Sequence, residues 1–363
     1  MDIRYEKINK EYDRYIKLDS SKKNILILGS ATSKNERANI INPISIDNAK
    51  LLYGEDSQLY KAYRDAYEIT QMPNIYTVNC YTIDDYINII YKIVQYDFNF
   101  IVPIGIDFRE ILYASNTEEE KYYVSILLDA MNQTESLSTV IMTDYHASDY
   151  EDIDYFLSDQ RDIIYDFINY EGNIDVLDRS GSNLIFVSNM LDGIEKSNAV
   201  LAAMLSINDS SSYLDYINLK PVYDIDKHDL PNFCNYVYFK YNYLNNKTNA
   251  ENLVNFRLRD DIYKKVLIDE LIKQVIRILD FSEYKGKIYT KYVDLQIKTS
   301  ITNKLKPFNK KIFKSYTLKD IRFVKLNDNT GYIYVELSIV PYDSFENVNI
   351  VMEVWLWTIL KIS

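Results

Sequence analysis

The stretch Asn24-Ile25-Leu26-Ile27-Leu28-Gly29 decides the fold of the first half of this chain. Four aliphatic residues in a row, followed by a glycine, are typical of a strand that is buried on both faces. Strands of this kind occur in parallel sheets whose two faces are covered by helices. Similar short apolar runs recur along the chain and predict strands over residues 24–29, 74–80, 98–104, 138–143 and 183–188.

Helix signals separate these apolar runs. Ser45, Ser57 and Thr82 each precede a stretch of helical spacing and are typical N-cap residues, and Gly54 is a typical stop. The pattern predicts helices over 45–54, 57–70, 82–94, 121–131, 150–171 and 198–207. Because strands and helices alternate over residues 24–207, we expect an α/β domain with a mainly parallel sheet and flanking helices.

The pattern changes near residue 218. We expect a hairpin near 236–241, a linker over 242–252, a long helix over 258–281, and strands over 317–326, 331–341 and 348–360. A helix followed by neighbouring strands predicts an α+β domain. The predicted organisation is an N-terminal arm at 1–23, an α/β domain at 24–245, a C-terminal α+β domain at 246–353 and a C-terminal arm at 354–363.

Composition excludes several classes of protein. The 363 residues carry a net charge of −12, which argues against a nucleic-acid-binding protein. No apolar run approaches the roughly 20 residues of a membrane span, and the charged first residues predict no signal peptide. Two cysteines, Cys80 and Cys234, exclude a disulfide framework, and two histidines exclude a histidine-rich metal site. We therefore expect no metal and no cofactor.

The charge is distributed unevenly. Residues 144–178 contain eleven acidic residues and one arginine, whereas residues 284–325 contain twelve Lys or Arg and two Asp. These stretches are either two solvated surfaces or two faces through which the protein associates with itself or with a charged partner.

Three patterns are candidates for enzyme chemistry. The loop Gly29-Ser30-Ala31-Thr32-Ser33-Lys34 follows a buried strand, where backbone N–H groups can bind phosphate. It lacks the glycines of a P-loop or a dinucleotide fingerprint, however. The group His146, Ser148 and Asp149 lies close in sequence, whereas the members of a catalytic triad normally come from separate loops. The carboxylates at 149–154 lack calcium-loop spacing. A soluble enzyme that binds a phosphorylated ligand at Gly29–Lys34 stays an alternative.

The C-terminal end is strongly apolar. Trp355 and Trp357 alternate with Leu356 and Thr358, as in a strand. An unpaired strand of this kind is an aggregation hazard, so we expect it to pair with its own sheet or with the sheet of a neighbouring subunit.

Several stretches together resemble the contractile tail sheath proteins of myophages and R-type bacteriocins. In the first half these are a strand ending in Gly29-Ser30-Ala31, a loop and a helix ending in Tyr53-Gly54, the run 98–103 and the small-residue helix 199–204. In the second half they are the strand 331–341, which ends in proline, and the strand 348–353. The sequence departs from the family at its arginine-rich loop, reduced here to Asn255-Phe256-Arg257-Leu258-Arg259, and in its aromatic tail. A sheath-like neck or baseplate ring protein is therefore a further alternative.

The resemblance implies a structural, non-enzymatic protein of a virion tail that is assembled in the host bacterial cytoplasm. Sheath subunits form stacked hexameric rings around a tail tube, exchange terminal strands, and contract to drive the tube through a cell envelope. Baseplate and neck proteins are the other implied partners, without direct nucleic-acid contact or membrane insertion. The expected tube-facing residues are Lys304, Lys306, Lys310, Lys311 and Lys314. The expected inter-subunit arm residues are Ile3, Tyr5, Trp355, Leu356, Trp357 and Ile359.

Overall fold

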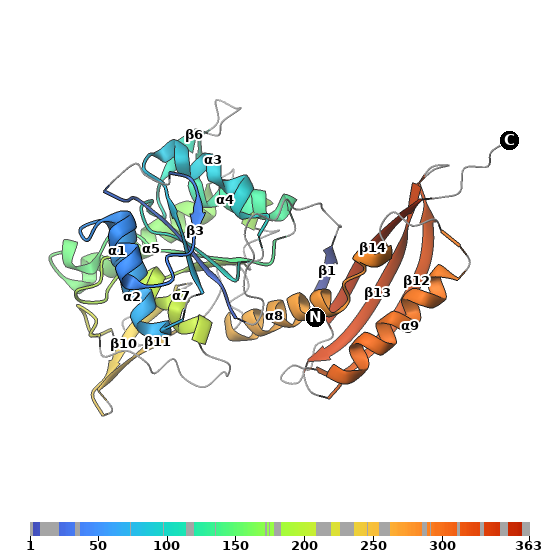
Figure 1. Ribbon diagram of the computed structural model, residues 1–363. Helices are drawn as coiled ribbons and strands as arrows, with labels where there is room; N and C mark the ends of the chain where they lie inside the picture. Colours follow the sequence, from blue (N-terminus) through green and yellow to red (C-terminus); the bar gives the residue numbers. More distant parts are fainter. Residues whose placement is uncertain are drawn as a thin grey trace. The chain divides into compact units, whose positions relative to one another are not determined.

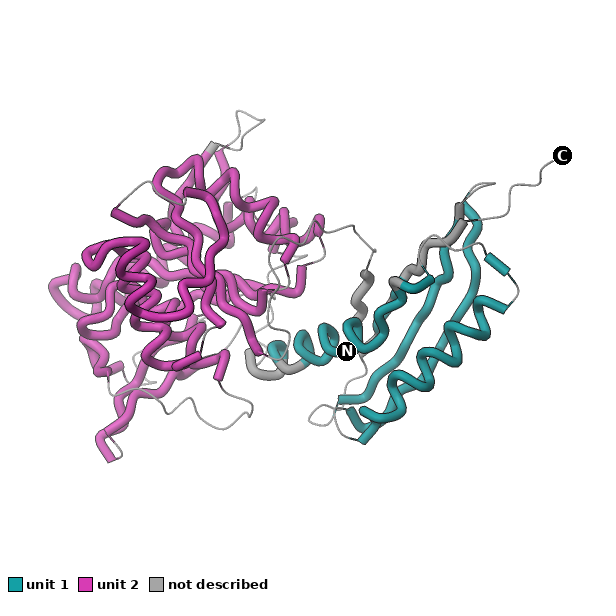
Figure 2. The backbone as a smooth tube through the Cα atoms, viewed as in Figure 1, with its two compact units in different colours: residues 1–13, 264–363 teal, residues 14–263 magenta. Residues whose placement is uncertain are grey.

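The computed structural model describes residues 3–7, 22–32, 37–72, 74–96, 98–113, 120–134, 136–170, 173, 175–177, 183–207, 219–225, 236–244, 246–253, 262–284, 289–290, 292–310, 313–326, 330–341 and 348–357. The chain folds as two compact units (Figure 2). The larger unit is Arg14–Tyr263, and the smaller unit combines Met1–Asp13 with Lys264–Ser363. The smaller unit is therefore built from both ends of the chain. The limits predicted from the sequence at residues 23, 245 and 353 stay predictions.

The larger unit contains a six-stranded sheet in the order β3-β4-β2-β5-β8-β9. Every neighbouring pair is parallel except β3 with β4. All five predicted strands are present, and the short β3 is added at one edge. The bounds are β2 Ile25–Gly29, β3 Ile40–Ile41, β4 Ile75–Asn79, β5 Phe100–Pro103, β8 Thr139–Met142 and β9 Leu184–Phe186.

Helices α1 to α5 and α7 connect and cover these strands (Figure 1). The predicted caps are present: the Ser45 and Ser57 hydroxyls accept backbone N–H groups, and Thr82 forms a capping box with Asp85. The helix α7 is buried from Ser197 to Leu205, because small residues let it lie against α2 and three strands. The bounds are α1 Ile46–Tyr53, α2 Gln58–Thr70, α3 Ile83–Ile93, α4 Tyr123–Gln133, α5 Ile153–Asn169 and α7 Ser197–Ile207.

One hairpin was not predicted from the sequence, and the hairpin expected near 236–241 is present but extends into the predicted linker. β6 (Ile111–Tyr113) and β7 (Glu120–Tyr122) pair where no strand was expected. The linker predicted over 242–252 is wrong, because β10 (Tyr238–Asn242) pairs antiparallel with β11 (Lys247–Glu251). The buried residues of β11 are Thr248 and Ala250, which give no apolar signal, and the Thr248 hydroxyl donates to the Leu219 carbonyl.

The smaller unit contains a four-stranded sheet in the order β1-β14-β13-β12. The strand β1 is parallel to β14, and the other pairs are antiparallel. Alternate residues of β13 and every fourth residue of α9 are buried, so this unit has its own core. The predicted helix and three strands are thus confirmed. The bounds are β1 Ile3–Lys7, α8 Ile262–Ile278, α9 Val293–Leu305, β12 Phe313–Lys325, β13 Thr330–Pro341 and β14 Val348–Trp357.

Gly331 is required by a close approach between β12 and β13. A Cβ atom at this position would overlap Phe323 Cζ and would lie 2.7 Å from the Val324 carbonyl oxygen, so the strands would have to move apart. We expect Gly331→Ala to lower the free energy of unfolding by about 2 kcal/mol, as overpacking does. Urea denaturation measures this loss. The exposed Ser315→Ala on the same sheet is the control and should change it by less than about 0.5 kcal/mol; an equal, small effect of both would contradict the prediction.

Candidate functional site

The carboxyl edge of the parallel sheet is where α/β proteins bind ligands. Here the described part of the Gly29–Lys34 loop turns inward. The Ala31 N–H donates to Asn79 Oδ1 over 3.0 Å, and the Thr32 N–H and hydroxyl both donate to the Tyr53 carbonyl. Gly29 is needed for packing, since a Cβ there would lie 2.6 Å from Ile104. The N–H groups of Ala31 and Thr32 are therefore already bonded to Asn79 and Tyr53. The geometry of this described part of the loop does not favour a phosphate site.

At the same edge of the sheet, Arg109 links three segments of the chain. Its Nε donates to Asp144 Oδ1 over 2.9 Å, and its Nη2 donates to Asp159 Oδ2 over 2.7 Å. Its guanidinium lies 4.2 Å from the centre of the Tyr145 ring. The Asp144 side chain is fully buried, and this burial raises the pKa of its carboxyl group, while Arg109 lowers it in part. The arginine thus neutralises a buried carboxylate and fixes the loop after β5 to the loop after β8.

Buried amides complete this edge. Asn198 Nδ2 donates to the carbonyls of Pro103 and Ile141, at the ends of β5 and β8. Asn189 Oδ1 accepts from the Ser197 N–H over 2.9 Å. Because these side chains use their hydrogen bonds on backbone groups, the strand ends are tied to α7, which is a structural role.

The group at 146–149 is a turn, not a triad. One ring nitrogen of His146 lies 2.7 Å from Ser148 Oγ, and the other lies 3.0 Å from the Leu191 carbonyl oxygen. The Asp149 carboxylate accepts the backbone N–H of His146 and caps the short 3-10 helix Ala147–Asp149. Because the second ring nitrogen contacts a carbonyl and not this carboxylate, the arrangement lacks the relay of a serine hydrolase. Within the described ranges, no three His, Cys, Asp or Glu side chains are grouped to hold a metal ion.

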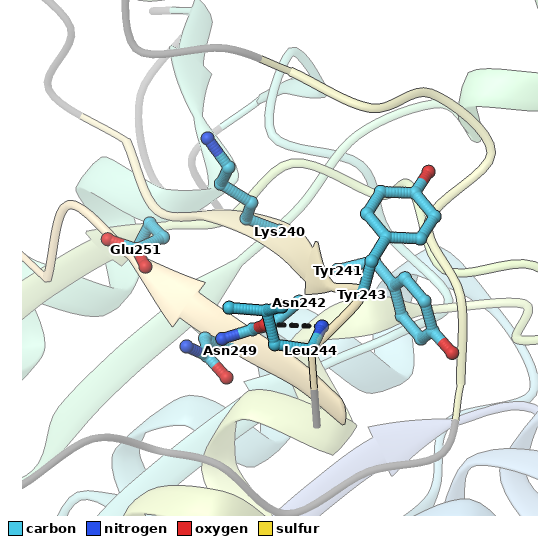
Figure 3. A pocket seen from close by; sticks show the side chains of 7 residues that line it. All are labelled: Lys240, Tyr241, Asn242, Tyr243, Leu244, Asn249 and Glu251. Carbon is cyan, nitrogen blue, oxygen red and sulfur yellow. Dashed lines mark hydrogen bonds between the residues drawn. The ribbon is translucent and has the colours of Figure 1, made fainter. Parts of the chain in front are cut away.

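A hollow of about 330 Å³ lies on the β10–β11 hairpin (Figure 3). Its lining side chains are spread along both strands and the turn that follows β10, and they do not converge on one point, as Figure 3 shows. Leu244 at the turn is 98% exposed. Such a surface offers no enclosed binding site. The lining residues are Lys240, Tyr241, Asn242, Tyr243, Leu244, Asn249 and Glu251.

The smaller unit brings most of the predicted arm residues into one sheet. Ile3 and Tyr5 lie on β1, opposite Val348 and Ile350 of β14. Figure 1 shows β1, from the blue end of the chain, beside β14 near the red end. Farther along β14, the three apolar residues Trp355, Leu356 and Trp357 lie opposite Tyr332, Gly331 and Thr330 of β13. In the single chain these strands pair with their own sheet. Ile359 lies outside the described residues.

The predicted tube-facing lysines divide into different environments. Lys304 is held within its unit, since its Nζ donates to the Asp280 carbonyl over 2.6 Å and lies 3.8 Å from Glu283. Lys306 and Lys310 are exposed in the connection between α9 and β12, and Lys314 is exposed on β12. Lys311 lies outside the described residues. The cations farther along β12 belong to the basic stretch 284–325 but were not among the named candidates, and they too are exposed: Lys319, Arg322 and Lys325.

Comparison with known proteins identifies the fold. No protein-family model matches this sequence, and no curated protein matches it. Among solved structures, the fold is similar to that of the sheath tail protein Lin1278 from Listeria innocua, with a TM-score of 0.56 and 10% sequence identity. The match covers 93% of this chain and 95% of that chain. The chain thus has a sheath-like fold over nearly its whole length. None of the described helices has the length and apolar character to cross a membrane.

Proposed function

We propose that this chain is a structural subunit of a contractile tail sheath. The observation that carries the proposal is the fold similarity to a sheath tail protein over 93% of this chain and 95% of the other, which includes both units. In this proposal the protein is not an enzyme. Its copies polymerise as stacked hexameric rings around an inner tail tube and contract to drive that tube through the target envelope. It is part of a virion tail, assembled in the host bacterial cytoplasm, and its further partners are baseplate and neck proteins.

Terminal strands link the copies. The strand β1 is an edge strand that pairs along five residues of β14. An edge position can be filled equally well by the same strand of another copy, since the backbone hydrogen bonds are identical. We infer that β1 and the end of β14 exchange between neighbours, with Ile3, Tyr5, Trp355, Leu356, Trp357 and Ile359 as linking residues.

Charged surface residues would make the weaker contacts, those between the subunit and the tube. The connection from α9 to β12 would face the tube through Lys306, Lys310, Lys311 and Lys314, whereas Lys304 supports that region through its internal bonds. Contacts between exposed charges are weak and screened by salt, which suits a tube that must slide. In this proposal contraction is driven by subunit packing and uses no nucleotide.

Electron microscopy of the purified protein over a range of concentrations tests this function. We expect long hollow tubes made of stacked rings. Assembly that stops at one ring would identify a neck or baseplate ring protein instead. Particles that stay single at every concentration would contradict both and would direct attention to a stability screen with phosphorylated ligands.

A further inference from the structure

The strand β12 forms the edge of the four-stranded sheet opposite β1. Its pairing with β13 is interrupted by register shifts between Phe313 and Ser315 and between Leu318 and Asp320. Bulges and charged side chains on an edge strand hinder the addition of another strand. Because β12 has both features, strand addition at this edge is disfavoured, and a partner that binds its charged side chains fits it better. The exposed cations of β12 are Lys314, Lys319, Arg322 and Lys325.

Positive charge predominates along this strand, which contains four cations and one carboxylate, Asp320. Arg322 is 3.3 Å from Asp320, and Lys319 is 4.0 Å from Glu336 on β13. The Arg322 side chain is nevertheless 63% exposed. It lies 4.7 Å from the centre of the Tyr334 ring, which holds the guanidinium in place. The positive charge of this edge therefore favours contact with a negatively charged surface.

The helix α5 carries an exposed face of the opposite charge. Its aromatic residues Tyr155 and Tyr165 are each 66% exposed, and Asp154, Asp162 and Asp166 are exposed beside them. Arg161 is the one basic residue of α5 and lies 3.2 Å from Asp162, so the carboxylates still outnumber the cations on this helix. The last turn of α5 contains Asp166 and no basic residue, although the carboxyl end of a helix disfavours negative charge. Exposed tyrosines are typical of protein interfaces. The exposed acidic and aromatic side chains of this face therefore favour contact with a positively charged surface. Asp166 in the last turn lowers the stability of the helix.

We propose that the exposed face of α5 in one copy docks on the β12 edge of a second copy. The charged helix face and the charged strand edge have similar lengths. The twelve residue steps from Asp154 to Asp166 span about 18 Å along a helix, and the six steps from Lys319 to Lys325 span about 20 Å along a strand. Tyr155 and Tyr165 supply apolar contact area beside the charges. The contact rests on the proposed sheath function only in that it would operate between neighbouring subunits, in addition to the exchange of strands.

Charge reversal tests this contact in the full-length protein. One variant carries Lys319→Glu with Arg322→Glu, a second carries Asp162→Lys with Asp166→Lys, and a third carries all four changes. We expect each pair alone to raise the concentration needed for self-association about tenfold. The third variant should associate like the wild type, and so should an equal mixture of the first two, because opposite charges meet again in each contact. Sedimentation velocity at roughly 0.05 M and 1 M salt measures association and its screening.

Matched controls use the exposed charges of α3. Lys92→Glu and Asp84→Lys should leave association unchanged. If the wild type forms tubes and the reversals have no effect, or if the fourfold variant is not rescued, the docking contact is overturned while the sheath function stands. If the wild type forms no tubes but shows salt-sensitive association that follows the rescue pattern, the contact stands and the sheath function fails. A protein that never associates overturns the contact.

Discussion

A chain carrying Arg4→Pro and Tyr5→Pro together will fold but will not form tubes. Proline lacks the N–H group that a strand donates to its neighbour. Successive residues of a strand direct their N–H groups to opposite sides, so one of the two prolines falls on a bond to β14 whichever side that is. Both residues lie within the described register, opposite Asn349 and Ile350. Strand exchange needs the hydrogen bonds between β1 and β14 in every subunit. Each copy that carries the prolines therefore weakens its link to the next copy, and the weakened links add up along the polymer.

The matched control is Arg4→Thr with Tyr5→Thr, which keeps both N–H groups and favours an extended backbone. Electron microscopy measures tube formation, and thermal unfolding checks that the chain is folded. We expect near-wild-type melting for both variants, since β1 adds five residues at one edge of the sheet. Tubes from the proline variant would show that β1 does not link the subunits. A proline variant that melts at a much lower temperature than the threonine variant would show instead that β1 stabilises the sheet of its own chain.

The larger unit was predictable because its strands are buried on both faces. Continuous apolar runs such as 25–28 and 100–103 have that pattern, and Ser45, Ser57 and Thr82 mark the helix starts by their hydroxyls. The smaller unit was predictable for a related reason. Alternate apolar residues of β13 form one face of a long strand, which is a clear signal of period two.

Other features depend on pairing that one sequence does not reveal. The strand β11 is polar, and its burial comes from Thr248 and Ala250, so its composition predicts a loop. The position of β1 beside β14 joins residues more than 340 positions apart, which no local pattern can indicate. The Arg109 cluster is hidden in the same way, because Asp144 and Asp159 reach it from other elements. The bonds from Ala31 and Thr32 to Asn79 and Tyr53 are hidden for the same reason, because both partners lie on other elements.

The Arg109 cluster gives the largest expected change in stability. Arg109→Met keeps the length of the side chain and removes the charge that neutralises fully buried Asp144. Removing one member of a buried ion pair leaves a charge without compensation, which costs about 3–5 kcal/mol. We expect a value near the lower limit, about 3 kcal/mol, because Arg109 is itself one-third exposed. Urea denaturation measures the loss. The exposed pair of Arg161 and Asp162 is the control, and Arg161→Met should change stability by less than about 0.5 kcal/mol.

A second change at Asp144 separates lost charge compensation from lost packing. If the buried carboxylate is the source of the loss, adding Asp144→Asn to Arg109→Met should recover part of the stability, whereas two independent packing defects would add. The pH dependence gives the same test. Burial raises the pKa of the Asp144 carboxyl in the folded chain, so the folded state takes up a proton before the unfolded state as the pH falls. The deficit of Arg109→Met should therefore shrink as the pH falls from neutral toward the ordinary carboxyl pKa of about 4. A deficit that is constant with pH, together with additive losses in the double variant, would assign the role of Arg109 to its contacts with Asp159 and the Tyr145 ring.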